Sequence, residues 1–225
     1  MRPYGVIFDM DGVLVDSFGP HYASWRITAE RRGFSLPEPL FRGVFGRTNA
    51  AIAPVITGAP VSDDEVLRWG EEKEAVYREI LARGFPAMPG AGELIEALRA
   101  DGARLAIGSS GPPENVAVVA ANLPAARHFD ATVTGRDVPR GKPDPGVFLL
   151  AADRLGLPAA SCAVVEDSLA GLEAARRAGC VAIALVGTSS REALAPNADL
   201  VVDSLRELTP AGIRERIGRG GRGRN

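Results

Sequence analysis

The stretch of sequence that decides the fold covers residues 4–17 and reads YGVIFDMDGVLVDS. Its apolar run at residues 6–8 leads directly into two aspartates, Asp9 and Asp11. A short apolar run that ends in polar residues is typical of a strand buried on both faces of a parallel sheet. Gly12 lets the chain turn sharply behind the two aspartates. We therefore expect a buried strand whose carboxyl end presents a pair of carboxylates.

Five more apolar runs follow, at residues 103–107, 131–133, 162–165, 181–186 and 200–202. Most of them are separated by stretches with helical periodicity, at residues 93–99, 147–155 and 169–176. Ser168 can cap the last of these helices at its start, and Gly179 can end it. Short strands that alternate with helices predict an α/β core, in which a parallel sheet is covered by helices on both faces.

The alternation is interrupted between about residues 17 and 85, where helical patterns occur at 21–32 and 62–83 without a strand pattern. Ser62 and Glu65 have the spacing of a capping box, which predicts the start of a helix. Pro86 and Pro89 mark a linker that returns the chain to the core. We therefore expect the α/β core at residues 1–15 and 88–217, with a helical cap at residues 16–87.

The composition is that of an ordinary globular chain of 225 residues with a formal net charge of −2. It has no basic surplus that would point to nucleic acid, and no apolar run nears the roughly 18 residues that a membrane span needs. Cys162 and Cys180 lack metal-type spacing, so we expect free thiols and a reducing, cytoplasmic location. Residues 218–225 are glycine, arginine and asparagine alone, and we expect a disordered tail there.

Polar side chains follow several of the predicted strands, namely Asp9, Asp11, Ser109, Ser110, Lys142, Glu166 and Asp167. Ligands of an open parallel sheet bind at the carboxyl ends of its strands, so we expect these residues to converge. Four carboxylates in one crevice repel one another, and a hard divalent cation with oxygen ligands removes that repulsion. The pattern therefore predicts a Mg²⁺ site among these carboxylates.

A cation beside a lysine and serine hydroxyls forms a strong phosphate site, and Lys142, Ser109 and Ser110 supply those groups. A carboxylate nucleophile can form an acyl phosphate, which divides one difficult step into two easier ones. We assign Asp9 as the nucleophile. Asp11 is the acid/base partner, a role typically worth about 10²–10⁴ in rate.

Four ordered motifs occur in the chain, at residues 8–17 (FDMDGVLVDS), 106–110 (AIGSS), 141–143 (GKP) and 164–168 (VVEDS). Together they resemble the motifs of the haloacid dehalogenase superfamily. The resemblance implies a Rossmann-like core with an inserted four-helix-type cap. It also implies Mg²⁺ bound by Asp9, the carbonyl of Asp11 and Asp167. Glu166 is then expected nearby, and the peptide bond before Pro143 is expected to be cis.

Within that superfamily, the second aspartate of the first motif narrows the activity. Asp11 argues against dehalogenases, which lack this aspartate, and against phosphonate-cleaving relatives, which carry a small residue there. The remaining group includes β-phosphoglucomutase, phosphoglycolate phosphatase and sugar-phosphate phosphatases. We therefore expect the chain either to transfer a phosphoryl group within its substrate or to release it as phosphate.

The cap has to discriminate among these activities, because the core contacts only the phosphoryl group. His21, Trp25 and Lys73 resemble residues of the β-phosphoglucomutase cap. Asn49 stands where such a mutase is expected to carry an arginine for the second phosphate. Arg47 could replace that arginine. We therefore treat His21, Arg47 and Lys73 as the candidate substrate residues of the cap.

The favoured hypothesis is a Mg²⁺-dependent phosphatase that hydrolyses a small phosphorylated metabolite, a sugar phosphate or a phosphoglycolate-like molecule, through an aspartyl-phosphate. A β-phosphoglucomutase-like sugar-phosphate mutase is the alternative. A third hypothesis is a phosphorylation-controlled switch without turnover, as in response-regulator receivers. In those domains the acidic pair precedes the Lys-Pro, whereas here Glu166 and Asp167 follow Lys142. The sequence leaves the substrate and the oligomeric state open.

Overall fold

The computed structural model describes residues 3–220 and divides the chain into two compact units. The core unit consists of Met1–Val15 and Ala87–Asn225, and the cap unit consists of Asp16–Pro86. Ala87 was expected in the cap. It instead forms an isolated antiparallel bridge with Val15, which places it in the core unit.

The core unit is built on a six-stranded sheet in which every pair of neighbouring strands is parallel. The strands are β1 (Gly5–Phe8), β2 (Arg104–Gly108), β3 (Ala131–Val133), β4 (Cys162–Glu166), β5 (Val181–Leu185) and β6 (Leu200–Val202). All six coincide with the predicted apolar runs to within a residue. The order across the sheet is β3-β2-β1-β4-β5-β6, which confirms the α/β fold class.

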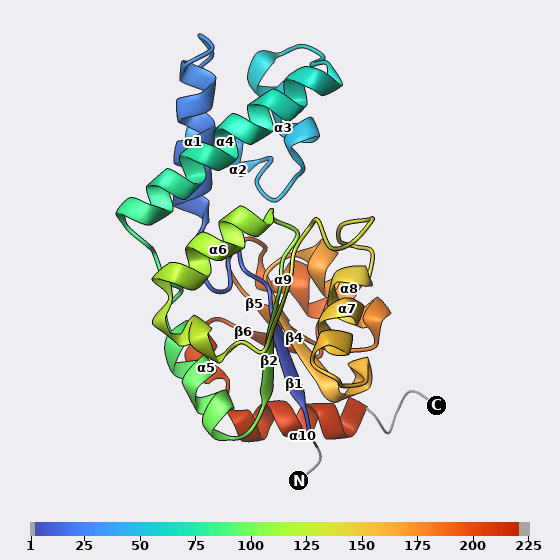
Figure 1. Cartoon of the computed structure of the whole chain (residues 1–225). Coiled ribbons are helices and arrows are strands. Elements are labelled where there is room, and N and C mark those ends of the chain that lie inside the picture. Colours follow the sequence, from blue (N-terminus) through green and yellow to red (C-terminus); the bar gives the residue numbers. More distant parts are fainter. Residues whose placement is uncertain (1–2, 221–225) are drawn as a thin grey trace. The chain divides into compact units, whose positions relative to one another are not determined.

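Helices cover both faces of this sheet (Figure 1). One face packs on α7 (Gly146–Arg154) and α8 (Leu169–Ala178), with Ile7, Ala106 and Val164 in the shared apolar core. On the other side lie α5 (Ala91–Ala100) and α6 (Pro113–Asn122). The remaining elements are α9 (Arg191–Leu194), α10 (Pro210–Gly220), η1 (Pro124–His128), η2 (Ala159–Ser161), η3 (Ala195–Asn197) and η4 (Leu205–Glu207). Every residue of β1 is buried, as a strand covered on both faces requires.

Local signals in the sequence account for the bounds of two helices. Ser168 caps α8 by accepting a hydrogen bond from the amide of Gly171, and the helix ends before Gly179, as predicted. The last helix, α10, runs on to Gly220, so the first three residues of the expected tail are helical. An ion pair between Arg219 and Glu215, one turn apart, supports this last turn. Residues 221–225 lie outside the described residues.

The cap unit consists of four helices, α1 (Phe18–Glu30), α2 (Glu38–Arg42), α3 (Asn49–Thr57) and α4 (Asp63–Arg83). The sequence predicted α1 and α4, and Ser62 caps α4 by accepting from the amide of Glu65. It did not predict α2, which is short, or α3, which contains Pro54. Their apolar residues pack in a core of their own, made of Trp25, Ala29, Leu36, Phe41, Val44, Ile52, Ile56 and Trp69.

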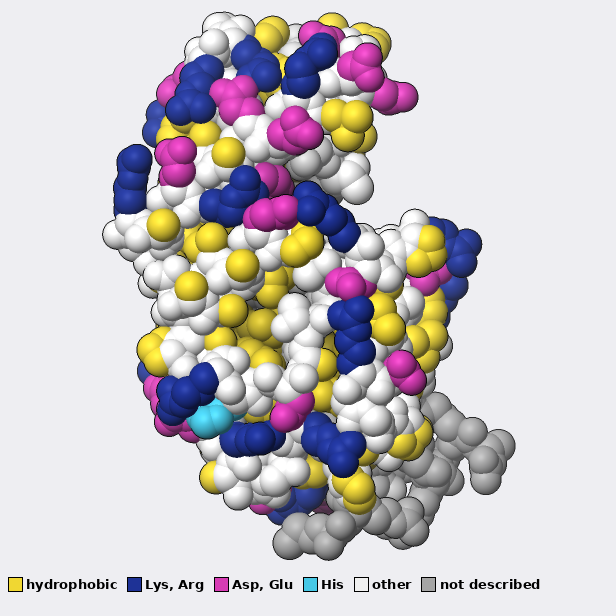
Figure 2. All heavy atoms as spheres, in the orientation of Figure 1, with side chains coloured by type: hydrophobic (Ala, Val, Ile, Leu, Met, Phe, Trp, Pro, Cys, Tyr) yellow, Lys and Arg dark blue, Asp and Glu magenta, His cyan; other side chains and the backbone are white. Residues whose placement is uncertain are grey.

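Charged side chains of both signs are interspersed on the surface of the cap helices (Figure 2). Several of them pair, as Arg31 and Arg32 do with Glu72. Within the described residues, no helix is both long and apolar enough to cross a membrane.

The order of the strands creates a switch point beside β1. The chain passes from β1 outward through β2 and β3, and then returns to the other side of β1 with β4. The two adjacent strands at this point, β1 and β4, end at Asp9 and at the pair Glu166-Asp167. Crevices of this kind, at the carboxyl ends of strands, are where open α/β sheets bind ligands.

Candidate active site

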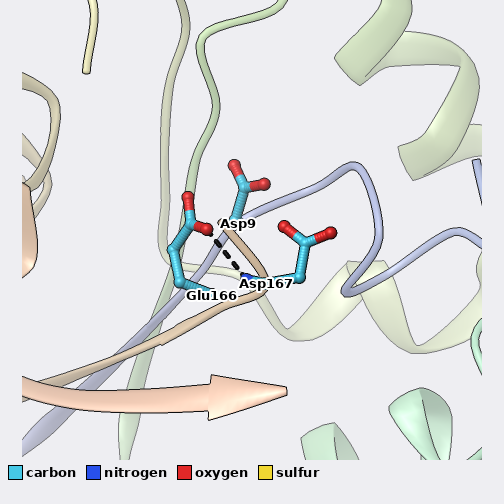
Figure 3. A group of neighbouring side chains, drawn as sticks. All are labelled: Asp9, Glu166 and Asp167. Atoms are coloured by element: carbon cyan, nitrogen blue, oxygen red, sulfur yellow. Dashed lines mark hydrogen bonds between the residues drawn. The ribbon is translucent and has the colours of Figure 1, made fainter. Parts of the chain in front are cut away.

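Three buried carboxylates meet at the ends of β1 and β4 (Figure 3). Asp9 is 8% exposed, Glu166 1% and Asp167 4%. Each offers a carboxylate oxygen, and these atoms all lie within 4.8 Å of one another. The parallel pairing of β1 with β4 puts Asp9 and Glu166 side by side, because Phe8 is in register with Val165. The predicted convergence of these acids is therefore present in the folded chain.

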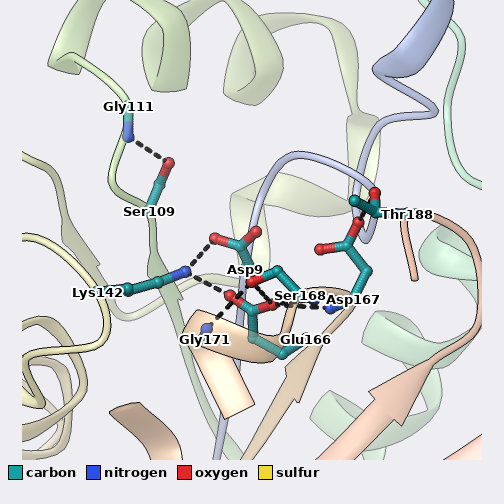
Figure 4. Close-up of polar contacts among 9 residues, drawn as sticks. All are labelled: Asp9, Ser109, Gly111, Lys142, Glu166, Asp167, Ser168, Gly171 and Thr188. Atoms are coloured by element: carbon teal, nitrogen blue, oxygen red, sulfur yellow. Dashed lines mark hydrogen bonds and ion pairs between the residues drawn. The ribbon is translucent and has the colours of Figure 1, made fainter. Parts of the chain in front are cut away.

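Lys142 joins two of these carboxylates (Figure 4). Its Nζ donates to Oδ1 of Asp9 at 2.6 Å and to Oε1 of Glu166 at 2.7 Å. The lysine comes from the loop that follows β3, and the peptide bond between Lys142 and Pro143 is cis, as expected. Arg177, on α8, donates from Nη1 to the carbonyl oxygen of Pro143 at 3.0 Å and so ties this loop to the helix.

The second oxygen of Glu166 is held by the chain that follows it. Oε2 accepts from the amide of Asp167 at 2.8 Å, and from the amide and hydroxyl of Ser168 at 2.7 and 2.9 Å. Gly171 lies against the same carboxylate, because a Cβ at this position would stand 1.8 Å from Oε1. Glu166 is thus fixed on both oxygens, and its contact with Lys142 is preorganised.

Burial and mutual repulsion dominate the electrostatics of the acids. Burial raises the pKa of Asp9 to about 7, and the charges of Glu166 and Asp11 add to this, whereas Lys142 opposes it. Burial also raises the pKa of Asp167 well above its usual range, with Glu166 and Asp9 as further causes. For Lys142, burial disfavours the charge, but Asp9 and Glu166 outweigh it and raise the pKa of the ammonium. The lysine therefore stays charged at neutral pH.

The other predicted residues of the core follow strands β1 and β2 at the same edge of the sheet. Asp11 is half-buried in the turn after β1, and its charge contributes to the raised pKa of Asp9. Ser109 is buried at the end of β2, and its Oγ accepts from the amide of Gly111 at 3.0 Å. Ser110 is exposed beside it. The predicted residues thus come from four strand ends, or from the loops after them, at one edge of the sheet.

The candidate residues of the cap fall into two sets. His21 and Lys73 are in contact, with Nδ1 and Nζ 2.8 Å apart, and Lys73 also pairs with Glu74 at 2.9 Å. The His21 ring stacks on Tyr77 with 4.1 Å between centroids. Arg47, in contrast, is exposed between α2 and α3.

Two other residues of the cap have structural roles in this unit. Trp25 is buried in the cap core, where its ring packs 6.3 Å from that of Trp69. Asn49, the first residue of α3, lies against Gly70 of α4. Both contacts join helices of the cap to one another.

Thr188 is a further residue at this cluster that the sequence did not predict, and its Oγ1 donates to Oδ2 of Asp167 (Figure 4). Thr188 lies three residues after the end of β5, so it shares the position after a strand with the other residues, but a lone threonine at such a position does not by itself indicate a site. Gly12, in the turn after β1, lies close to the same oxygen of Asp167. A Cβ at Gly12 would stand 1.9 Å from Oδ2 of Asp167, and the φ of +75° also favours glycine.

The donor set fits a divalent cation. Asp9, Glu166 and Asp167 form a group of oxygen donors that can hold a metal ion, and the cluster has more carboxylates than it has cations. Hard cations such as Mg²⁺ and Ca²⁺ take oxygen ligands of this kind. Burial, together with repulsion among the acids, raises the pKa of Asp9 and of Asp167, and a bound cation would favour their charged forms.

Comparison with known proteins identifies the same family that the four sequence motifs resemble. Residues 5–179 match the haloacid dehalogenase-like hydrolase family. Hexitol phosphatase A of Escherichia coli is 36% identical over 93% of this chain and 94% of its own. β-Phosphoglucomutase of Bacillus subtilis is 29% identical over 91% of each chain. A family IA hydrolase of the same superfamily from Entamoeba histolytica has a solved structure that superimposes with a TM-score of 0.86 at 29% identity, over 96% of this chain and 99% of that one.

The family match covers most of the chain, the sequence relatives align along nearly the whole length, and the structure carries the acidic cluster at the expected switch point. The chain therefore belongs to the haloacid dehalogenase-like hydrolase family and is a phosphatase or phosphomutase of that family.

Proposed function

We propose that the chain is a Mg²⁺-dependent phosphatase that hydrolyses a small phosphorylated sugar through an aspartyl-phosphate on Asp9. The observation that carries this proposal is the position of the Asp9 carboxylate. It stands at the switch point of the sheet, 2.6 Å from the Lys142 ammonium and beside two further acids. A carboxylate is suited to attack a phosphate ester when a positive group lies on one side of it and carboxylate oxygens that can bind a metal ion lie on the other.

In the first step, an oxygen of Asp9 forms a bond to phosphorus while the ester P–O bond breaks. Asp11 gives its proton to the leaving oxygen, so that the sugar departs as an alcohol. Lys142 neutralises charge on the phosphoryl oxygens, and the hydroxyl of Ser109 donates to them. Positioning of this kind supplies most of the catalysis in phosphoryl transfer.

In the second step, Asp11 takes a proton from water, and the water oxygen bonds to phosphorus. The bond between phosphorus and the Asp9 oxygen then breaks, which releases inorganic phosphate and restores both aspartates. Asp11 thus acts as an acid first and as a base second. General acid/base help of this kind is worth about 10²–10⁴ in rate.

Mg²⁺ would be held by Asp9, Asp167 and the carbonyl of Asp11, where it would supply positive charge to the transferring phosphoryl group. Glu166 belongs to the same acidic group, but its two oxygens already hold Lys142 and three donors of the following turn. Asp9 and Asp167 therefore have the freer oxygens. Glu166 acts chiefly by holding Lys142 against Asp9.

The substrate class rests on the relatives. Hexitol phosphatase A and β-phosphoglucomutase are both named for phosphorylated polyols or sugars, and both align along more than nine-tenths of this chain. We therefore propose a sugar or sugar-alcohol phosphate as substrate. A phosphoglycolate-like molecule is the smaller alternative, since a phosphoglycolate phosphatase of Salmonella typhimurium is 28% identical.

A panel of sugar phosphates with phosphoglycolate, assayed for phosphate release in Mg²⁺ with wild type and Asp9→Asn, tests the proposal. We expect the wild type to release phosphate from at least one ester, and the variant, which keeps the shape of the side chain, to release none. Brief incubation with substrate and acid quenching should leave the phosphoryl group on the peptide that contains Asp9. Turnover that survives in Asp9→Asn would refute the covalent mechanism.

A sugar-phosphate mutase is the second candidate, and one observation in the cap favours it. His21 and Lys73 resemble residues of the mutase cap, and they contact each other at 2.8 Å. Asn49, where the mutase is expected to carry an arginine, is half-buried against Gly70 of α4, and it weakens this candidate. A mutase should interconvert sugar 1- and 6-phosphates when activated by a bisphosphate. Hydrolysis of both isomers without interconversion would exclude it.

A further inference from the structure

We infer that Thr188 is a positioning residue for the cation site, and that its hydroxyl sets how tightly the site binds Mg²⁺. This inference rests on the proposed function, because it assumes that Asp167 is a ligand of the metal. Thr188 belongs to the loop between β5 and α9, which none of the four sequence motifs includes. It thus adds a fifth segment of the core unit to the site.

The first observation is the hydrogen bond itself. Oγ1 of Thr188 donates to Oδ2 of Asp167, a residue that is only 4% exposed. The bond occupies one of the two oxygens of this acid. Figure 4 shows the other oxygen directed toward Asp9, on the side where the three carboxylates face one another.

The second observation is that the same oxygen is confined from the opposite loop. Gly12 follows β1, and a Cβ there would stand 1.9 Å from Oδ2 of Asp167. Asp167 is thus held between the backbone of one loop and the hydroxyl of another. A side chain confined at one oxygen can present the other in only one direction. This is the condition under which a carboxylate binds a cation with little loss of conformational entropy.

The hydroxyl is the part of Thr188 that contacts the acid. Hydrogen-bond partners of metal ligands typically change metal affinity or activity by about 10–100-fold when they are removed. Thr188→Val keeps the shape of the side chain and removes the hydroxyl, whereas Thr188→Ser keeps the hydroxyl. The two variants separate the hydrogen bond from the packing of the loop.

The same loop offers a matched control. Ser190 lies two residues on, is exposed, and caps α9 by accepting from the amide of Ala193. Ser190→Ala therefore removes a hydroxyl from this loop without touching the acidic cluster. Any effect that Thr188→Val shares with Ser190→Ala comes from the loop and not from Asp167.

The test is a calorimetric titration of Mg²⁺ alone into the four proteins, without substrate, with thermal unfolding in chelator to check that each one folds. We expect Thr188→Val to bind Mg²⁺ about 10–100-fold more weakly than the wild type. Thr188→Ser and Ser190→Ala should stay within about threefold. The Mg²⁺ concentration for half-maximal turnover should rise in Thr188→Val alone, with kcat largely recovered at saturating Mg²⁺.

Each other result contradicts the inference in a distinguishable way. If the wild type and Thr188→Val bind Mg²⁺ equally, the role of Thr188 is wrong while the proposed function stands. If the wild type itself binds no Mg²⁺, the metal dependence of the proposed function fails, and the inference fails with it. If Thr188→Val does not fold, the comparison moves to Thr188→Ala, for which the same weakening is expected and equal binding refutes the inference.

Discussion

The Nζ of Lys142 lies 2.6 Å from Oδ1 of Asp9, and 133 positions of the sequence separate the two residues. The same nitrogen donates to Glu166 at 2.7 Å, so one ammonium links the carboxyl ends of two adjacent strands. All three side chains are nearly buried. In such a setting the lysine both neutralises Asp9, the proposed nucleophile, and orients it, because its two partners fix the position of the charge.

Lys142→Met should therefore remove most of the activity. Loss of one preorganised group that stabilises the transition state typically costs about 10²–10³ in kcat. Breaking a buried ion pair also destabilises the fold, by about 3–5 kcal/mol. Because Lys142 lowers the pKa of Asp9, that pKa should rise further and shift the active range to higher pH. Steady-state kinetics against pH and chemical denaturation measure these effects.

The matched control is Arg140→Met, in the same loop. Arg140 is a mostly exposed cation that pairs with Asp144 at 3.0 Å. Its loss should change the free energy of unfolding by no more than about 0.5 kcal/mol, as for most surface substitutions. An equal loss of activity in both variants would show that activity depends on the structure of this loop and not on the charge of Lys142.

The affinity for Mg²⁺ should increase with pH between about pH 6 and 8. Burial raises the pKa of Asp9 to about 7, so below that value the metal-free site holds a proton that a cation must displace. The affinity for Mg²⁺ is therefore highest at pH values above the raised pKa of Asp9, and it decreases as the pH falls below that value. The displacement of one proton makes the loss of affinity small above the raised pKa and makes it approach about tenfold for each pH unit well below it, by the equivalence of a pKa unit with 1.36 kcal/mol. Titration calorimetry at pH 6, 7 and 8 measures it. An affinity independent of pH would contradict the raised pKa.

Gly12→Ala should weaken the cation site more than it weakens the fold. The new methyl group would stand 1.9 Å from Oδ2 of Asp167, so that carboxylate has to move. The positive φ of +75° adds a conformational cost of about 1–2 kcal/mol for any other residue. Gly102→Ala is the control, because its φ is +84° and nothing lies near its Cβ position. Both variants should lose similar stability in chelator, and only Gly12→Ala should lose Mg²⁺ binding. Equal Mg²⁺ binding in both would show that Asp167 tolerates the methyl group.

The sequence predicted the core because its strands are buried on both faces. Runs such as residues 162–165 are continuously apolar, and between helical periods such short runs indicate parallel strands that helices cover on both sides. The cap was harder to predict. α2 has five residues and α3 contains Pro54, so neither shows the long periodic pattern that identified α4.

The residues of the site could be predicted from the strand ends, but their pairings could not. That Lys142 contacts Asp9 and Glu166 depends on β4 returning beside β1, which is a property of the strand order. Thr188 follows β5 and was missed because a lone threonine after a strand carries no chemical signal until its partner is known. The contact between His21 and Lys73 similarly depends on how α1 and α4 pack.

Gly171→Ala should lower activity, although glycine to alanine inside a helix ordinarily stabilises a protein by about 0.5–1 kcal/mol. Gly171 is the third residue of α8, and a Cβ there would stand 1.8 Å from Oε1 of Glu166, the oxygen that accepts from Lys142. The carboxylate must move, which releases Lys142 from one of its two partners. Gly92→Ala, in the first turn of α5 with open space around its Cβ position, is the control and should be neutral or stabilising with full activity. Kinetics and denaturant unfolding of both variants decide the matter: a fully active Gly171→Ala would mean that Glu166 does not hold Lys142 in the working enzyme.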